Sequence, residues 1–88
     1  MNTIHKFILS EDGAAIEMPH GAKILHVAEQ RGNSWLWAEV NTTAPSVLRR
    51  FVPVGTGHPL PDGARAFVGT TLLLDGALVL HWYEVGRL

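Results

Sequence analysis

The fold is decided by the stretch Leu72-Leu73-Leu74-Asp75-Gly76-Ala77-Leu78-Val79-Leu80. An Asp-Gly pair between two apolar runs is the preferred centre of a two-residue type I′ turn, which joins neighbouring antiparallel strands. The stretch therefore predicts a β-hairpin in which Leu74 lies opposite Ala77. Because such a turn fixes the register of both strands, the other opposed pairs of the hairpin follow by counting outward.

The predicted register divides the side chains of the hairpin between two faces. One face carries Leu72/Val79, Thr70/His81 and Val68/Tyr83, and the other carries Leu73/Leu78, Thr71/Leu80 and Gly69/Trp82. In this register the ring of Trp82 covers the bare backbone of Gly69. Near the turn both faces are apolar, whereas a hairpin with one solvated face alternates. We therefore expect the hairpin to be covered on both sides, by the rest of its own fold and by a second subunit.

The rest of the chain has the pattern of an all-β domain, because Gly and Pro interrupt it roughly every ten residues. No window keeps a helical period. Strands are expected at 3–9, 14–18, 23–29, 34–40, 48–54, 65–74 and 77–85. The prediction is a single β domain over residues 1–88, a small antiparallel sandwich or partly open barrel of about seven strands.

Composition excludes several classes of protein. The 88 residues are 47% hydrophobic with a net charge of −1, which argues against disorder and against binding of polymeric nucleic acid. The absence of Cys excludes a disulfide scaffold, an iron–sulfur site and thiol catalysis. The longest charge-free apolar run, from 66 to 74, is far shorter than the roughly 20 residues that span a membrane. No secretory signal is visible at the start of the sequence.

The apolar content is high for a chain of this size. A domain of about this length buries only roughly 60–65% of the surface that its unfolded chain exposes. Three Trp and 47% hydrophobic residues therefore leave more apolar surface than a monomer readily hides. We expect the surplus to form a protein–protein interface, most simply in a homo-oligomer.

Four segments together resemble a family of short, uncharacterised bacteriophage-encoded proteins. They are Ile4-His5-Lys6-Phe7, Met18-Pro19-His20-Gly21-Ala22-Lys23-Ile24-Leu25, Arg49-Arg50-Phe51-Val52-Pro53-Val54-Gly55-Thr56-Gly57-His58-Pro59-Leu60-Pro61, and Phe67-Val68-Gly69-Thr70. The Gly-Thr-Gly-His-Pro segment is the most specific part of the resemblance. The resemblance implies a phage protein made in the cytoplasm of a bacterial host. By analogy of size and context, it suggests the oligomeric phage sponges that sequester nucleotide signals of host defence.

The loop Gly55-Thr56-Gly57-His58 is the first candidate ligand site. Two Gly around a Thr can direct successive backbone N–H groups at an anion, and the preceding Arg49 and Arg50 carry positive charge. Adjacent residues of a strand point to opposite faces, so only one of the two Arg can serve a given pocket. The structural alternative is a tight turn that needs glycine for its backbone conformation.

A second candidate is the pair Trp35 and Trp37. Two residues apart on a strand, they face the same side and offer a surface on which a nucleobase or sugar could stack. The alternative is that both rings are buried in a core or an interface.

Metal binding and catalysis have little support. The five His show no metal-ligand spacing, and no nucleophile elbow or paired acid/base carboxylates are evident. A hydrolase that uses His58 as a general base is a weaker hypothesis of function than ligand binding or protein interaction. We expect no catalytic residue, no metal and no cofactor.

The sequence favours a non-enzymatic, homo-oligomeric phage accessory protein that binds a small anionic ligand of nucleotide type, such as a host defence signal, at subunit boundaries. Its expected ligand contacts are Arg49, Arg50, Gly55, Thr56, Gly57, His58, Trp35 and Trp37. The alternative is a protein-interaction module without a small-molecule site, either an inhibitor of a host protein or a structural accessory of the virion.

Overall fold

The computed structural model describes residues 1–86, which form seven β-strands. The strands are β1 (Asn2–Leu9), β2 (Ala15–Pro19), β3 (Lys23–Gln30), β4 (Asn33–Asn41), β5 (Ser46–Gly55), β6 (Ala64–Leu73) and β7 (Leu78–Val85). Each lies within two residues of its predicted range. Within the described residues, no helix is long and apolar enough to cross a membrane.

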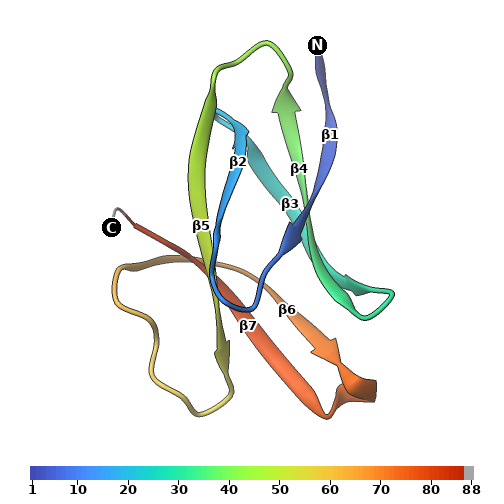
Figure 1. Cartoon of the computed structure of the whole chain (residues 1–88), viewed down its shortest axis with the longest axis vertical. Coiled ribbons are helices and arrows are strands. Elements are labelled where there is room, and N and C mark those ends of the chain that lie inside the picture. The colour runs from blue at the N-terminus through green and yellow to red at the C-terminus, as the bar shows by residue number, and fades with distance from the viewer. Residues whose placement is uncertain (87–88) are drawn as a thin grey trace.

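The strands form two antiparallel sheets that pack face to face (Figure 1). One sheet has the order β1-β4-β3 and the other has the order β2-β5-β7-β6. Strand β3 packs against β6, so the two sheets approach each other along that side. The sheets do not close into a barrel, and the all-β prediction is confirmed as an open sandwich.

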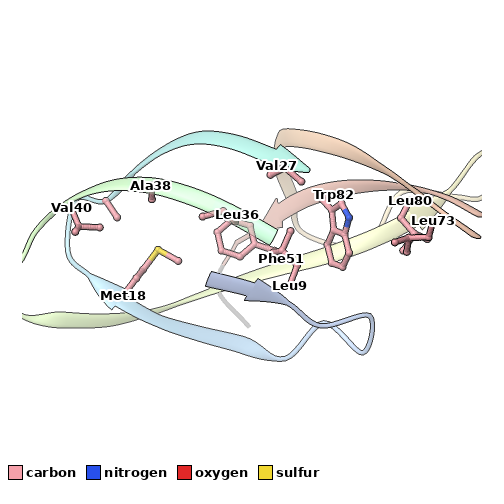
Figure 2. Packing of buried hydrophobic residues seen from close by; sticks show 11 residues of the cluster. Leu9, Met18, Val27, Leu36, Ala38, Val40, Phe51, Leu73, Leu80 and Trp82 are labelled. Atoms are coloured by element: carbon pink, nitrogen blue, oxygen red, sulfur yellow. The ribbon is translucent and has the colours of Figure 1, made fainter. Parts of the chain in front are cut away.

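The core lies between the sheets because successive side chains of a strand point to opposite faces, and the inner face of each sheet is apolar. In β4, Leu36, Ala38 and Val40 are buried, while Trp35 and Trp37, which point to the outer face, are only half-buried. Figure 2 shows the buried side chains filling the space between the two layers. The cluster consists of Leu9, Met18, Ala22, Val27, Leu36, Ala38, Val40, Phe51, Leu73, Leu80 and Trp82.

One buried polar junction ties the two sheets together. Ser34 of β4 donates to Oγ1 of Thr71 at 2.8 Å, and Nε1 of Trp82 donates to the same oxygen at 2.9 Å. All three side chains are buried, so the Ser34 hydroxyl and the Trp82 N–H both depend on Oγ1 of Thr71 as their hydrogen-bond acceptor.

The predicted hairpin forms between β6 and β7. Asp75 (φ 54°) and Gly76 (φ 86°) occupy the two central positions, and the N–H of Ala77 donates to the carbonyl of Leu74 at 3.0 Å. Positive φ at both central residues is the mark of a type I′ turn, as predicted. Leu74 itself has a φ of 52°, which the sequence did not predict.

The predicted register holds from Leu73/Leu78 to Gly69/Trp82 and then fails. A β-bulge between Phe67 and Gly69 places Phe67, rather than Val68, opposite Tyr83. A bulge inserts one extra residue and shifts all pairs beyond it, and nothing in the spacing of apolar residues revealed it.

Gly69 is required by a contact other than the predicted one. A Cβ at this position would lie 2.6 Å from Cβ of Val27 on the facing sheet. The close approach of β3 and β6, rather than cover by the Trp82 ring, is therefore the reason that only glycine fits here.

Candidate functional site

Arg49 and Arg50 are adjacent on β5 and point to opposite faces of the sheet, as strand geometry requires. Arg49 lies on the inner face, where its Nε and Nη2 donate to the two carboxylate oxygens of Glu84 on β7, each at 2.7 Å. Its Nη1 donates to the carbonyl of Ala22 at 2.6 Å. Arg49 therefore joins β5, β7 and the β2–β3 turn.

The charge of Arg49 is matched within the fold. Hydrogen bonding to Glu84 raises the pKa of the guanidinium above its ordinary value, against the opposing effect of burial. Both side chains are more than three-quarters buried, and the pair is bidentate, which is the favourable geometry for Arg and a carboxylate. We conclude that Arg49 serves the structure first.

Arg50 lies on the outer face and borders an open cleft. Its Nε donates to the carbonyl of Gly13 at 2.7 Å, which fixes the side chain beside the β1–β2 turn. The cleft has a volume of about 470 Å³ and is lined by Ala15, Leu48, Arg49, Arg50, Arg65, Glu84, Val85 and Gly86. We call it the arginine cleft.

The arginine cleft is electropositive. Three arginines line it against a single acidic residue, Glu84, which Arg49 already holds. Asp62 lines a neighbouring hollow that shares Arg50 with the cleft. The pKa of exposed Asp12 is lowered, first by a hydrogen bond from Ser10, with a minor contribution from the charge of Arg50.

Arg65 is a cleft residue that sequence reasoning missed. Val85 of β7 lies opposite Arg50 on one side and opposite Ala64 on the other, so the neighbouring Arg65 reaches the same region from β6. The register is irregular between Ala64 and Ala66, which frees Arg65 from the ladder. Only the strand order β5-β7-β6 reveals this convergence, and spacing along the chain carries no signal for it.

The Gly55–His58 loop lies elsewhere. Its turn is closed by the N–H of His58, which donates to the carbonyl of Gly55 at 3.0 Å, and Gly57 has a φ of 87°. The loop therefore forms the tight turn that the sequence offered as the structural alternative to a ligand site. Thr56 follows Arg50 by six residues along an extended strand, or roughly 20 Å. The structure therefore does not bring the loop and the arginine pair into one pocket.

The loop instead borders a smaller hollow on the outer face of β7. Its volume is about 230 Å³, and it is lined by Val54, Gly55, Thr56, Gly57, His58, Leu60, Phe67, His81 and Tyr83. His81 is held on both sides, with Nε2 2.7 Å from Oγ1 of Thr56 and Nδ1 3.0 Å from Oγ1 of Thr70. These bonds occupy both ring nitrogens of His81.

Trp35 and Trp37 lie on a third surface, the outer face of β4. Nζ of Lys6 lies 4.1 Å from the centre of the Trp35 ring and is hydrogen-bonded to Oε1 of Gln30. The ring of His26 lies 5.9 Å from that of Trp37. The two Trp share a face, as predicted, but that face belongs to the other sheet from the arginine cleft.

Metal ligands do not gather in the described part of the chain. No group of three or more His, Cys, Asp or Glu side chains is placed to hold an ion among residues 1–86.

Comparison with known proteins gives one match. A family model described as a domain of unknown function (DUF7352) matches residues 1–87. No curated protein and no solved structure matches the chain.

Proposed function

We propose that this chain, which belongs to the DUF7352 family, is a non-enzymatic binding protein that takes a small anionic ligand of nucleotide type in the arginine cleft. The observation that supports this most is the pair Arg50 and Arg65. Both line the cleft, and within residues 1–86 neither forms an ion pair with a carboxylate. Two guanidinium groups in one cleft favour a phosphate.

The shape and lining of the cleft suit such a ligand. A volume of about 470 Å³ lies within the range of small-molecule sites, which is roughly 300–1,000 Å³. Leu48, Ala15 and Val85 supply apolar surface for a base or sugar beside the charged groups. The Gly55–His58 loop and the Trp35/Trp37 face, two parts of the predicted site, lie outside this cleft and are not needed for it.

The protein acts, on this proposal, as a homo-oligomer. Leu72 is 59% exposed and Leu74 is 75% exposed on the hairpin, where the sequence led us to expect a second subunit. Surfaces of this kind usually mark contacts between proteins. The resemblance to phage proteins suggests a role in a bacterial cytoplasm, where binding would sequester a nucleotide signal of host defence.

Calorimetric titration with mono-, di- and cyclic nucleotides tests the ligand proposal. We expect Arg50→Ala and Arg65→Ala each to weaken binding by about 1.5–3 kcal/mol, the scale of a hydrogen bond to a charged group. Binding should also weaken as salt rises, because the contact is electrostatic. Arg31→Asn, which removes a positive charge from the turn between β3 and β4 on the other sheet, is the matched control and should bind as wild type does.

Two results would contradict the ligand proposal. Wild type that binds no nucleotide at low salt would remove the proposed ligand class. Binding that survives Arg50→Ala/Arg65→Ala unchanged would place the site elsewhere, with the hollow beside His81 as the next candidate.

The second candidate function is a protein-interaction module. The exposed Leu72, Leu74 and Phe67 of β6 and its turn favour it, because a partner protein would cover them as well as a second subunit would. Under this hypothesis Leu72→Lys abolishes partner binding, whereas Arg50→Ala has no effect.

A further inference from the structure

The arginine cleft adjoins a second hollow, with a volume of about 430 Å³. The lining of this hollow consists of Arg50, Val52, Pro61, Asp62, Gly63, Val85 and Gly86. Arg50, Val85 and Gly86 also line the cleft, so the two spaces meet at these residues. Asp62 is the one acidic residue among those that line the second space, which we call the Asp62 hollow.

A backbone turn places Asp62 at this hollow. The N–H of Ala64 donates to the carbonyl of Pro61 at 3.2 Å and closes the turn, in which Gly63 has a φ of 77°. The carbonyl of Gly63 accepts from the N–H of Gly86 at 2.7 Å. This bond ties the turn to the end of β7, and Figure 1 shows the end of the β5–β6 connection beside it. Backbone bonds therefore hold Asp62 in place without the help of its carboxylate.

The carboxylate of Asp62 has no partner within residues 1–86. It accepts no hydrogen bond there and forms no ion pair, although Arg50 lines the same hollow. Nε of Arg50 donates to the carbonyl of Gly13, whereas its two Nη groups have no acceptor in the same part of the chain. The hollow thus presents a group that only accepts hydrogen bonds and a group that only donates them, and the two do not neutralise each other.

Arg65 reaches the junction of the two spaces from β6. Its Cδ lies only 3.0 Å from the position that a Cβ of Gly86 would take, so the stem of Arg65 packs on the bare backbone just after β7. Gly86 lines both the cleft and the Asp62 hollow. Arg65 and Arg50 are therefore both at the place where the two spaces meet.

We propose that the ligand is a ribonucleotide whose phosphate lies between Arg50 and Arg65 and whose ribose enters the hollow, where the carboxylate of Asp62 accepts hydrogen bonds from the two ribose hydroxyls. This inference rests on the proposed function and names its ligand more closely. A carboxylate accepts hydrogen bonds and donates none, so the part of the ligand that meets Asp62 has to donate. Acidic side chains bind ribose hydroxyls in this way in dinucleotide-binding folds.

The order of groups in a nucleotide favours the ribose over the base as the partner of Asp62. The sugar lies between the phosphate and the base, so a carboxylate that shares a hollow with Arg50 meets the sugar first. Bases also stack best on aromatic rings, and no aromatic side chain of the described chain lines the hollow. The neighbouring hydroxyls of the ribose offer two donors for the two oxygens of the carboxylate.

Calorimetric titration of wild type with four probes tests the ribose contact. The probes are adenosine monophosphate, dideoxyadenosine monophosphate, purine riboside monophosphate and inorganic pyrophosphate. The second probe lacks both ribose hydroxyls, and the third lacks the amine of the base. We expect wild type to bind adenosine monophosphate about tenfold more tightly than the dideoxy analogue, and to bind purine riboside monophosphate as tightly as adenosine monophosphate.

Asp62→Ala should change the binding of two probes in different directions. It removes a negative charge beside the phosphate site, so pyrophosphate should bind at least as tightly as it binds wild type. Adenosine monophosphate should bind about tenfold less tightly, because its hydroxyls lose their acceptor. Asp62 is exposed, so the fold should tolerate the change, and circular dichroism checks this. Glu39→Ala removes the same charge from an exposed position on the other sheet and should leave all four affinities unchanged.

The outcomes that overturn this inference differ from those that overturn the proposed function. A wild type that binds none of the four probes would overturn both. A wild type that binds adenosine monophosphate and its dideoxy analogue equally would overturn the ribose contact alone, and this comparison needs no variant to fold. Weaker binding of purine riboside monophosphate alone would assign the carboxylate to the base instead. A preference for ribose that persists in Asp62→Ala would assign the hydroxyls to another group.

Discussion

Adjacent arginines on one strand have different roles because a strand sends neighbouring side chains to opposite faces. Arg49 is held by Glu84 and by the carbonyl of Ala22, whereas Arg50 borders the cleft with only the carbonyl of Gly13 as its partner in the described chain. Both arginines line the cleft, so the sequence-based expectation that only one of them serves a ligand stays a prediction. Of the two, Arg50 is the one without a carboxylate partner within residues 1–86.

Removing Arg49 should lower the free energy of unfolding more than removing any exposed arginine. Arg49→Ala leaves the largely buried carboxylate of Glu84 without its bidentate partner, and we expect a loss of about 2 kcal/mol in the free energy of unfolding. Urea unfolding measures it. Because both changes break the same pair, Arg49→Ala/Glu84→Gln should cost less than the sum of the single changes. Additive losses would show that the pair is not coupled.

Leu74 adopts a backbone conformation that leucine normally avoids. Its φ of 52° lies in the left-handed region, which costs a residue with a Cβ about 1–2 kcal/mol, and its side chain is 75% exposed. Leu74→Asn should therefore raise the free energy of unfolding by about 0.5–1 kcal/mol, because Asn tolerates this region. Thermal unfolding measures it under conditions where the chain is monomeric. A loss of stability would mean that the exposed Leu side chain makes contacts that outweigh the strain.

At the scale of elements, the packing of β3 on β6 depends on Gly69. We expect Gly69→Ala to cost about 1–3 kcal/mol, since its Cβ would lie 2.6 Å from Cβ of Val27. Gly55→Ala is the matched control, because a Cβ there meets only the His58 ring at an ordinary 3.6 Å. Equal thermal melting temperatures of the two variants would argue against a tight contact between these strands.

The junction at Thr71 joins the same two layers by hydrogen bonds. Thr71→Val keeps the shape of the side chain but leaves the Ser34 hydroxyl and the Trp82 N–H buried without an acceptor. We expect a loss of about 2–4 kcal/mol, because each buried polar group left unsatisfied costs roughly 1–3 kcal/mol. Ser34→Ala, which removes only one donor, should cost less. If guanidinium unfolding found the two variants equally stable, Thr71 would not be the centre of the junction.

Local patterns predicted the elements well. The Asp75-Gly76 turn, the shared face of Trp35 and Trp37 and the seven strand ranges all follow from residue types and short-range spacing, and the structure confirms them. The features that the spacing of residues along the chain did not reveal depend on contacts between strands that are distant in sequence. The bulges of β6, the pairing of Arg49 with Glu84 and the arrival of Arg65 in the cleft all require knowledge of which strands are neighbours.

At the scale of the whole molecule, the hairpin separates an outer apolar face from an inner one. Leu72 is exposed and Leu73 is buried, although both are leucines on one strand. Leu72→Lys should therefore keep the fold and lower the number of chains per particle in light scattering, whereas Leu73→Lys should unfold the chain. An oligomer that is unaffected by Leu72→Lys would remove the hairpin from the assembly surface.

The central claim is that an assembly of this chain carries a small anion in its arginine cleft. Native mass spectrometry of protein purified from cells, beside Arg50→Ala/Arg65→Ala prepared in the same way, tests it most directly. We expect an oligomer of wild type that retains about the mass of one nucleotide per occupied cleft, and a double variant that assembles equally well but without the added mass. A wild-type chain that appears as a bare monomer would contradict the claim.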